Sequence, residues 1–223
     1  KIFFFINKHM STIIDRFTKI NSNINNLKSN KKVNIIAVSK TFPLEHIMPL
    51  VECGHTHFGE NKVQEAVSKW REIKLKRQNL KLHMIGKLQS NKAKSAAELF
   101  DYIHSLDSQK LADIFSSFEK NNQKKLKYFI QVNIGNENQK SGIPESELEA
   151  FFNYCKIEKN LSVLGLMIIP PNDQNHNKYF KHIDYLNKSL GLEELSMGMS
   201  SDYEDAVRCN STFVRIGSSI FGE

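Results

Sequence analysis

Short apolar segments alternate with longer amphipathic segments along most of this chain, and this alternation limits the folds that it can adopt. The first apolar run, VNIIAV, is short and rich in β-branched residues, which is typical of a strand buried on both faces of a parallel sheet. Seven further segments are interpreted in the same way. The predicted strands cover residues 33–38, 55–59, 82–86, 102–107, 128–133, 163–169, 194–198 and 212–217.

Helices are predicted between these strands. They cover residues 43–52, 61–77, 90–100, 108–120, 144–154, 175–190 and 202–208, and one more precedes the first strand at residues 12–28. Eight strands that alternate with helices predict an α/β fold, a single (β/α)8 TIM barrel with an extra N-terminal helix. An open doubly wound sheet is the alternative, but no G-x-G-x-x-G follows the first strand. We expect one domain overall, with an extension and first helix at 1–32 and the barrel at 33–223.

The composition indicates a globular protein that resides in a reducing compartment. Cys53, Cys155 and Cys209 are odd in number and widely spaced, so they predict neither a disulfide framework nor a metal site, and we expect a cytoplasmic protein. The net charge of +7 comes from lysines scattered over many segments, so we expect no nucleic-acid binding. The apolar part of KIFFFINKHM is too short to span a membrane. We treat Met10 as an alternative start and assign no function before it.

Lys40 follows the first strand directly and is the leading candidate for chemistry. A lysine buried at a strand end loses hydration, so its pKa falls and its amine becomes a nucleophile for a carbonyl group. A solvated lysine at a strand end is the alternative. The carboxyl ends of the strands form the active face of such barrels, so this lysine is expected to face other strand-end residues. Polar residues there include Asn61, Gly86, Gln89, Ser90, Asn133, Ser200, Ser201, Gly217 and Ser218.

Two strand ends suit a phosphate group. MGMSS (197–201) and RIGS (215–218) each place glycine and hydroxyl groups at a turn, and phosphate sites after the last two strands recur in this fold. Helix capping is the alternative for each. The histidines lack metal-ligand spacing, so we expect no metal site. Glu60 and Glu65 are interpreted as a solvated helix start, while Met167 is either core or a contact of a bound ring.

Several motifs together resemble one known family. They are AVSKT (37–41), FGEN (58–61), VQEA (63–66), IGKLQSNK (85–92), IHSLDS (103–108), QVN (131–133), KSG (140–142), GLM (165–167), LSMGMSSDYEDA (195–206) and VRIGSSIFG (214–222). In this order they look like the pyridoxal phosphate homeostasis proteins, also called YggS-like or PROSC proteins. The resemblance implies a barrel like the N-terminal domain of alanine racemase, with pyridoxal 5'-phosphate (PLP) as the cofactor.

The resemblance also implies roles for single residues. Lys40 would form the internal aldimine with PLP, and Asn61 would lie near the ring, with Met167 as a further contact. Ser200 and the backbone amides of Gly217 and Ser218 would hold the phosphate. Arg215 matches the racemase arginine that faces the pyridine nitrogen, and an ion pair at the barrel rim is its alternative. The chain departs from the family at Ser218, where threonine is common, and at Lys87, where the residue varies.

The implied function is intracellular PLP homeostasis by a non-catalytic carrier that passes PLP to apo-enzymes. We expect a monomer, with a dimer as the alternative, and no membrane partner. Racemases and decarboxylases of this type carry a second, β-rich domain, which we do not expect here because the eighth predicted strand ends close to Glu223. The rivals are a racemase-like PLP enzyme, a lysine-dependent aldolase without PLP, and a scaffolding barrel with an unused pocket.

Overall fold

The strands form a closed barrel. The computed structural model describes residues 2–27, 31–135, 141–171 and 175–222, except for the side chains of residues 2–11. Neighbouring strands are parallel and follow the order of the chain, and the last strand pairs with the first. The strands are β1 (Asn34–Val38), β2 (His57–Glu60), β3 (Lys81–Met84), β4 (Tyr102–Leu106), β5 (Lys127–Gln131), β6 (Val163–Met167), β7 (Glu194–Ser196) and β8 (Phe213–Ile216). The predicted TIM barrel is confirmed, and the open sheet is excluded.

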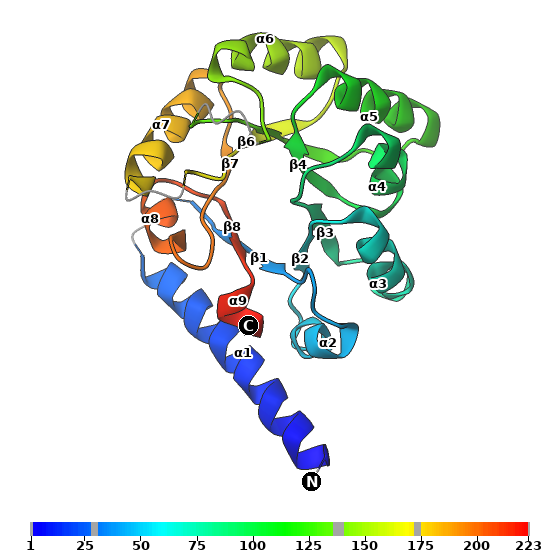
Figure 1. Cartoon of the computed structure of the whole chain (residues 1–223), viewed down its shortest axis with the longest axis vertical. Coiled ribbons are helices and arrows are strands. Elements are labelled where there is room, and N and C mark those ends of the chain that lie inside the picture. The colour runs from blue at the N-terminus through cyan, green and yellow to red at the C-terminus, as the bar shows by residue number, and fades with distance from the viewer. Residues whose placement is uncertain (1, 28–30, 136–140, 172–174, 223) are drawn as a thin grey trace.

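Helices surround the strands, as Figure 1 shows. They are α1 (Ile2–Asn26), α2 (Leu44–Glu52), α3 (Val63–Lys76), α4 (Ala93–Leu99), α5 (Gln109–Asn122), α6 (Leu148–Asn153), α7 (His176–Ser189), α8 (Tyr203–Arg208) and α9 (Ser218–Phe221). Local signals set several ends: Pro43 precedes α2, and the hydroxyl of Ser108 accepts the Leu111 N–H at the start of α5. Short 3₁₀ turns precede α4 and α6, and a π-helical turn follows α6.

Helix α1 lies against the outside of the barrel. It begins at Ile2 instead of residue 12 as predicted, and it packs on α2 and α9 (Figure 1). Ile13, Ile20 and Ile24 fall on one buried face, at helical spacing. The amide of Asn23 reaches the Tyr203 hydroxyl of α8 at 3.4 Å. The helix therefore packs on the outer ring of helices, beside α2, α8 and α9.

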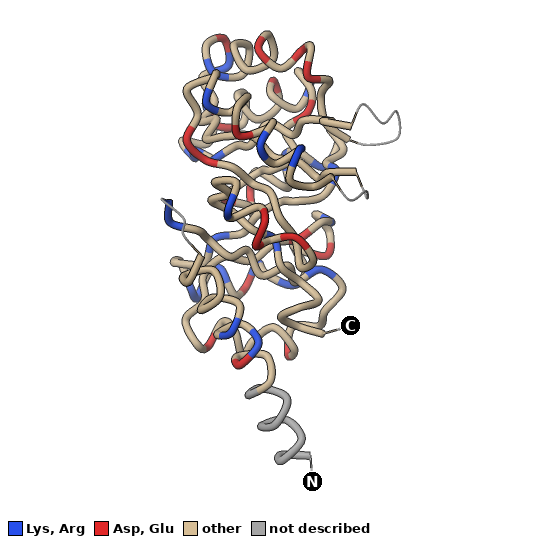
Figure 2. Tube along the Cα trace, turned by 90° about the vertical axis from the view of Figure 1, so that its left-hand side faces the viewer, with Lys and Arg blue, Asp and Glu red and all other residues tan. Residues whose placement is uncertain are grey.

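Charged residues are mixed over the surface. Figure 2 shows Lys and Arg interspersed with Asp and Glu along the trace, so the positive charge is dispersed as the sequence predicts. Across the described ranges, none of the helices is both long and apolar enough to cross a membrane. Lys28, the last residue of the first predicted helix, and Lys140, the first residue of the KSG motif, lie outside the described residues.

Candidate functional site at the carboxyl ends of the strands

A cavity of about 680 Å³ opens at the carboxyl ends of the strands. Its walls come from residues at or just beyond the ends of β1, β2, β3, β6, β7 and β8, and β1 and β8 are neighbours because their pairing closes the barrel. Six of the residues selected above line it, namely Lys40, Asn61, Ser200, Arg215, Gly217 and Ser218. Ser201 and Gly86 line it too, whereas Gln89, Ser90 and Asn133 are not among its lining residues.

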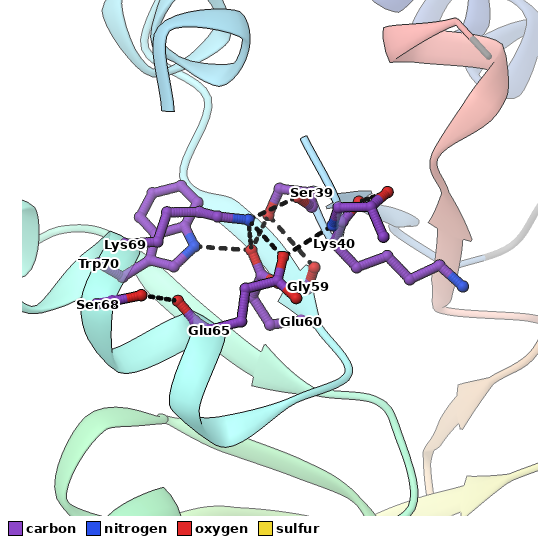
Figure 3. Close-up of polar contacts among 9 residues, drawn as sticks. Ser39, Lys40, Gly59, Glu60, Glu65, Ser68, Lys69 and Trp70 are labelled. Carbon is purple, nitrogen blue, oxygen red and sulfur yellow. Dashed lines mark hydrogen bonds and ion pairs between the residues drawn. The ribbon is translucent and has the colours of Figure 1, made fainter. Parts of the chain in front are cut away.

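Lys40 lies just beyond the end of β1 and is one of the residues that line the cavity. It is exposed, so the prediction of a lysine that loses its hydration by burial is wrong. Figure 3 shows its side chain extending away from Glu60, Lys69 and Trp70, which lie on the other side of the backbone. Within the described part of the chain, the Lys40 ammonium has no hydrogen-bond or ion-pair partner. It is therefore available to a ligand.

Arg215 of β8 lies deep in the cavity and is only 4% exposed. Its guanidinium donates to the Ser196 hydroxyl at 2.7 Å and to the Ile168 carbonyl at 2.8 Å. Burial lowers the pKa of the Arg215 guanidinium to about 10, although the negative charge of Asp202 acts to raise it. The guanidinium therefore stays protonated at neutral pH. No carboxylate of the described residues forms an ion pair with it, so the rim ion pair is not found.

A chain of hydrogen bonds runs from Arg215 through the interior of the barrel. Ser196 contacts His104 Nδ1 at 2.8 Å, His104 Nε2 contacts His83 Nδ1 at 2.9 Å, and His83 Nε2 contacts His57 Nδ1 at 2.9 Å. Burial, reinforced by neighbouring positive groups, lowers the pKa of His83 and His104 far below the usual value. These histidines are therefore neutral at physiological pH. Sequence reasoning missed this chain, although the histidines sit on three consecutive strands.

The turns after β7 and β8 meet at one corner of the cavity. The Ser218 hydroxyl lies 3.3 Å from the Ser200 hydroxyl, which also accepts the Ser219 N–H at 3.5 Å. Gly198, with φ of +94°, allows this turn, since a Cβ there would lie 2.6 Å from that of Ala206. In the described part of the chain, the backbone N–H groups of Ser200, Ser201, Gly217 and Ser218 donate no hydrogen bond. This corner offers unpaired donors to an anion.

Asn61 lies against Gly86 in the cavity wall. A Cβ on Gly86 would lie 2.4 Å from the Asn61 carbonyl oxygen, so only glycine permits this close approach. The side-chain oxygen of Asn61 is buried and has no hydrogen-bond partner among the residues that the structure describes. A buried acceptor without a donor is unfavourable, and a ligand in the cavity can relieve this.

Met167 lies elsewhere. It is fully buried inside the barrel and packs in a cluster with Ile36, Phe129 and Phe213, and it is not among the cavity's lining residues. This position agrees with core packing, the alternative to a ring contact. Met199, on the turn after β7, lines the cavity in its place.

The expectation for Glu60 is also corrected. It is fully buried at the end of β2, where one oxygen accepts hydrogen bonds from Ser39, Lys69 and Trp70, so it is no solvated helix start (Figure 3). Glu60, Lys69 and Trp70 lie on the side of the backbone opposite the Lys40 side chain (Figure 3). Over the described residues, no group of three or more His, Cys, Asp and Glu side chains could hold a metal ion.

Comparison with known proteins places the chain in a family. The family described as alanine racemase, N-terminal domain, matches residues 16–223. The chain is 38% identical over 205 residues to the pyridoxal phosphate homeostasis protein of Haemophilus influenzae, covering 87% of this chain and 86% of the relative. The protein of that name from Pasteurella multocida is also 38% identical, over 227 residues, with 95% and 97% covered.

A solved structure agrees with this placement. PipY of Synechococcus elongatus PCC7942, whose structure has PLP bound, is 34% identical and superimposes with a TM-score of 0.84. The match covers 94% of this chain and all of the PipY chain. The match to PipY, in sequence and in fold, thus extends over nearly the whole of both chains. The chain belongs to the pyridoxal phosphate homeostasis proteins, within the family of the alanine racemase N-terminal domain.

Proposed function

We propose that this chain is a PLP-binding protein of intracellular vitamin B6 homeostasis, which holds the cofactor in the cavity and passes it to apo-enzymes. One observation carries the proposal: a single cavity combines an unpaired amine, a buried guanidinium and a corner of unpaired N–H groups. PLP presents an aldehyde, a ring nitrogen and a phosphate, which match these three in kind. The names of the curated relatives and the PLP in the PipY structure support it.

The phosphate fits the corner formed by the turns after β7 and β8. Four unpaired backbone N–H groups and the hydroxyls of Ser200 and Ser218 are hydrogen-bond donors, and no acidic side chain of the described residues lines this cavity. Donors to a doubly charged phosphate form stronger bonds than those between neutral groups. We therefore assign Ser200, Gly217 and Ser218 to phosphate binding.

Lys40 supplies the covalent anchor. Its neutral amine adds to the aldehyde carbon, a C=N bond forms, and the carbonyl oxygen leaves as one water molecule. The reaction needs no oxidant and reverses when water returns, which is what release to another protein requires. Because Lys40 is exposed in the cavity, its amine needs no rearrangement of the barrel to reach the cofactor.

Arg215 supports a non-catalytic role. Bound PLP supplies an electron-withdrawing ring that stabilises a carbanion best when the ring nitrogen is protonated. We assign Arg215 to this nitrogen, where a guanidinium can only donate a hydrogen bond and so keeps the nitrogen unprotonated. Ser196 and the Ile168 carbonyl hold the guanidinium in place. A racemase-like enzyme is the alternative, and it predicts proton exchange at the α-carbon of an amino acid.

The cysteines support the proposed cytoplasmic setting. All three are free thiols, with Cys53 exposed and the other two buried. Free thiols persist in a reducing compartment. We propose that the protein acts there as a monomer, with PLP and apo-enzymes as its partners.

Transfer of the cofactor tests this function. The PLP-loaded protein is mixed with an apo-enzyme, and recovery of enzyme activity is compared with that from the same amount of free PLP. A carrier reactivates the apo-enzyme fully, even when a trap for free aldehyde is present. If the trap abolishes reactivation, delivery through the protein is contradicted. The Lys40→Ala variant is the control for weakly held PLP.

A further inference from the structure

A buried lysine lies directly behind Lys40. Lys69 of α3 is only 8% exposed, and its ammonium donates to the Ser39 carbonyl at 2.9 Å, to Glu60 at 2.9 Å and to Glu65 at 3.1 Å (Figure 3). Each donor position of this ammonium therefore has an acceptor. Burying charged side chains such as these costs desolvation free energy, which is offset only when every charged group is well hydrogen-bonded. Even then, a buried ion pair adds little to the stability of the fold.

The ion group formed by Lys69, Glu60 and Glu65 holds Ser39, the residue before Lys40. The Ser39 carbonyl accepts from Lys69, while its hydroxyl donates to Glu60 at 2.7 Å. Trp70 donates to the same Glu60 oxygen at 2.9 Å, which fixes the carboxylate from the other side. Backbone and side chain of Ser39 are thus both tied to the ion group.

The same group holds the residue after Lys40. The Thr41 N–H donates to Glu65 at 2.8 Å, and its hydroxyl donates to the Lys40 carbonyl at 2.6 Å. Thr41 has φ of +67°, a left-handed conformation that is strongly unfavourable for a β-branched residue. Such a conformation persists only where the surroundings enforce it, and the bond to Glu65 does so here.

We infer that Lys69, Glu60 and Glu65 are positioning residues, which hold the backbone on both sides of Lys40 so that its amine is presented to the cavity. The inference rests on the proposed function, because it concerns attachment of PLP to Lys40. None of the three lines the cavity. They act only through Ser39 and Thr41, and their carboxylates and ammonium are directed away from the Lys40 amine (Figure 3).

Matched variants on α3 separate positioning from general stability. Glu65→Ala removes the acceptor of the Thr41 N–H, and Glu72→Ala is its control, an exposed glutamate on the same helix. Lys69→Met removes the buried ammonium, and Lys74→Met is its control. Lys74 forms an ion pair with Asp101 at 2.7 Å, also partly buried, but away from the cavity.

The first measurement is the fraction of bound PLP that borohydride fixes covalently on Lys40. We expect Glu65→Ala to lower the ratio of attached to unattached PLP about tenfold, the effect of losing one charge-assisted hydrogen bond, while both controls keep the wild-type value. Lys69→Met loses three such bonds and should lower this ratio at least as much. Thr41→Gly in the Glu65→Ala background should restore part of it, because glycine adopts positive φ without strain. Equal fractions in variants and controls would overturn the inference.

The second measurement uses the cofactor-free protein. Amide hydrogen exchange of a peptide spanning residues 39–42 should be faster in Glu65→Ala than in Glu72→Ala. Unchanged exchange would overturn the inference even if attachment falls, because the backbone is what the group is inferred to hold. If wild-type protein forms no adduct on Lys40, the proposed function fails, and exchange alone then decides the positioning role.

Discussion

Arg215 donates a hydrogen bond to Ser196 across 2.7 Å, and this contact sets the direction of every hydrogen bond behind it. A guanidinium only donates, and the Ser196 hydroxyl has no acceptor other than His104 among the described residues. The hydroxyl hydrogen therefore goes to His104 Nδ1. His104 then donates through Nε2 to His83, and His83 through Nε2 to His57. All three rings carry their hydrogen on Nε2.

Removing Ser196 should disturb this chain measurably. In Ser196→Ala, both Arg215 and His104 lose a buried partner, and we expect a loss of about 1–3 kcal/mol in the free energy of unfolding. Nitrogen NMR should report the Nε2–H form in wild type and a changed His104 signal in the variant. Ser105→Ala is the matched control, because the Ser105 hydroxyl is buried and has no hydrogen-bond partner within the described ranges. An equal loss in both variants would contradict the hydrogen-bond chain.

The buried histidines predict that the protein loses stability in acid. Burial lowers the pKa of His55 and His57 to about 4, and it also lowers the pKa of His83 and of His104 well below the usual value for histidine. Between about pH 4 and 6.5 the unfolded chain binds protons that the folded one does not, so the free energy of unfolding rises with pH in this window. Urea unfolding measured across it should show the rise.

A pair of variants tests that assignment. His83→Gln removes a buried histidine and should reduce the slope of stability against pH, whatever its effect on stability itself. His182→Gln, at an exposed histidine that contacts Glu145, is the comparison variant. Identical slopes in the two variants would refute the role of the buried ring.

The phosphate corner predicts selective retention of the phosphorylated cofactor. Ser200→Ala should weaken PLP retention by about 1–3 kcal/mol, the range for losing a hydrogen bond to a charged group. Pyridoxal, which lacks the phosphate, should be retained far less well by the wild type. Equilibrium dialysis measures both, with Ser189→Ala on the exposed face of α7 as the control. Equal retention of PLP and pyridoxal would place the phosphate elsewhere.

The assignment of Arg215 predicts no useful turnover of amino acids. With PLP-loaded protein and L-alanine in deuterated water, the α-proton should persist in the NMR spectrum, because an unprotonated ring nitrogen makes the cofactor a poor electron acceptor. Free PLP at the same concentration gives the background rate. Exchange at an enzyme-like rate that Lys40→Ala abolishes would favour the racemase-like enzyme.

Much of the fold was predictable because strands in a parallel barrel have a clear sequence pattern. Segments buried on both faces read as continuous apolar runs, so all eight strands were located, with ends that differ by a few residues. Helix α9 was missed, since its residues 218–221 are too few to show a helical period. The early start of α1 at Ile2 was also missed.

The site was predictable where a residue's place in the chain determines its position. Lys40, Ser200 and Gly217 lie within a few residues of strand ends, and strand ends meet at one edge of a barrel. Glu60 was misjudged because a glutamate after an apolar run looks solvated, whereas hydrogen bonds from Ser39, Lys69 and Trp70 make its burial tolerable. Met167 was placed by its motif, whereas packing inside the barrel decides its position.

Attachment of PLP to Lys40 is the most direct test of the account. The protein is loaded with PLP, reduced with borohydride and digested, and mass spectrometry locates the modified lysine. The account predicts modification of Lys40, with no visible absorption band or adduct in a folded Lys40→Ala variant. Modification of another lysine, or an unchanged adduct in Lys40→Ala, would contradict it.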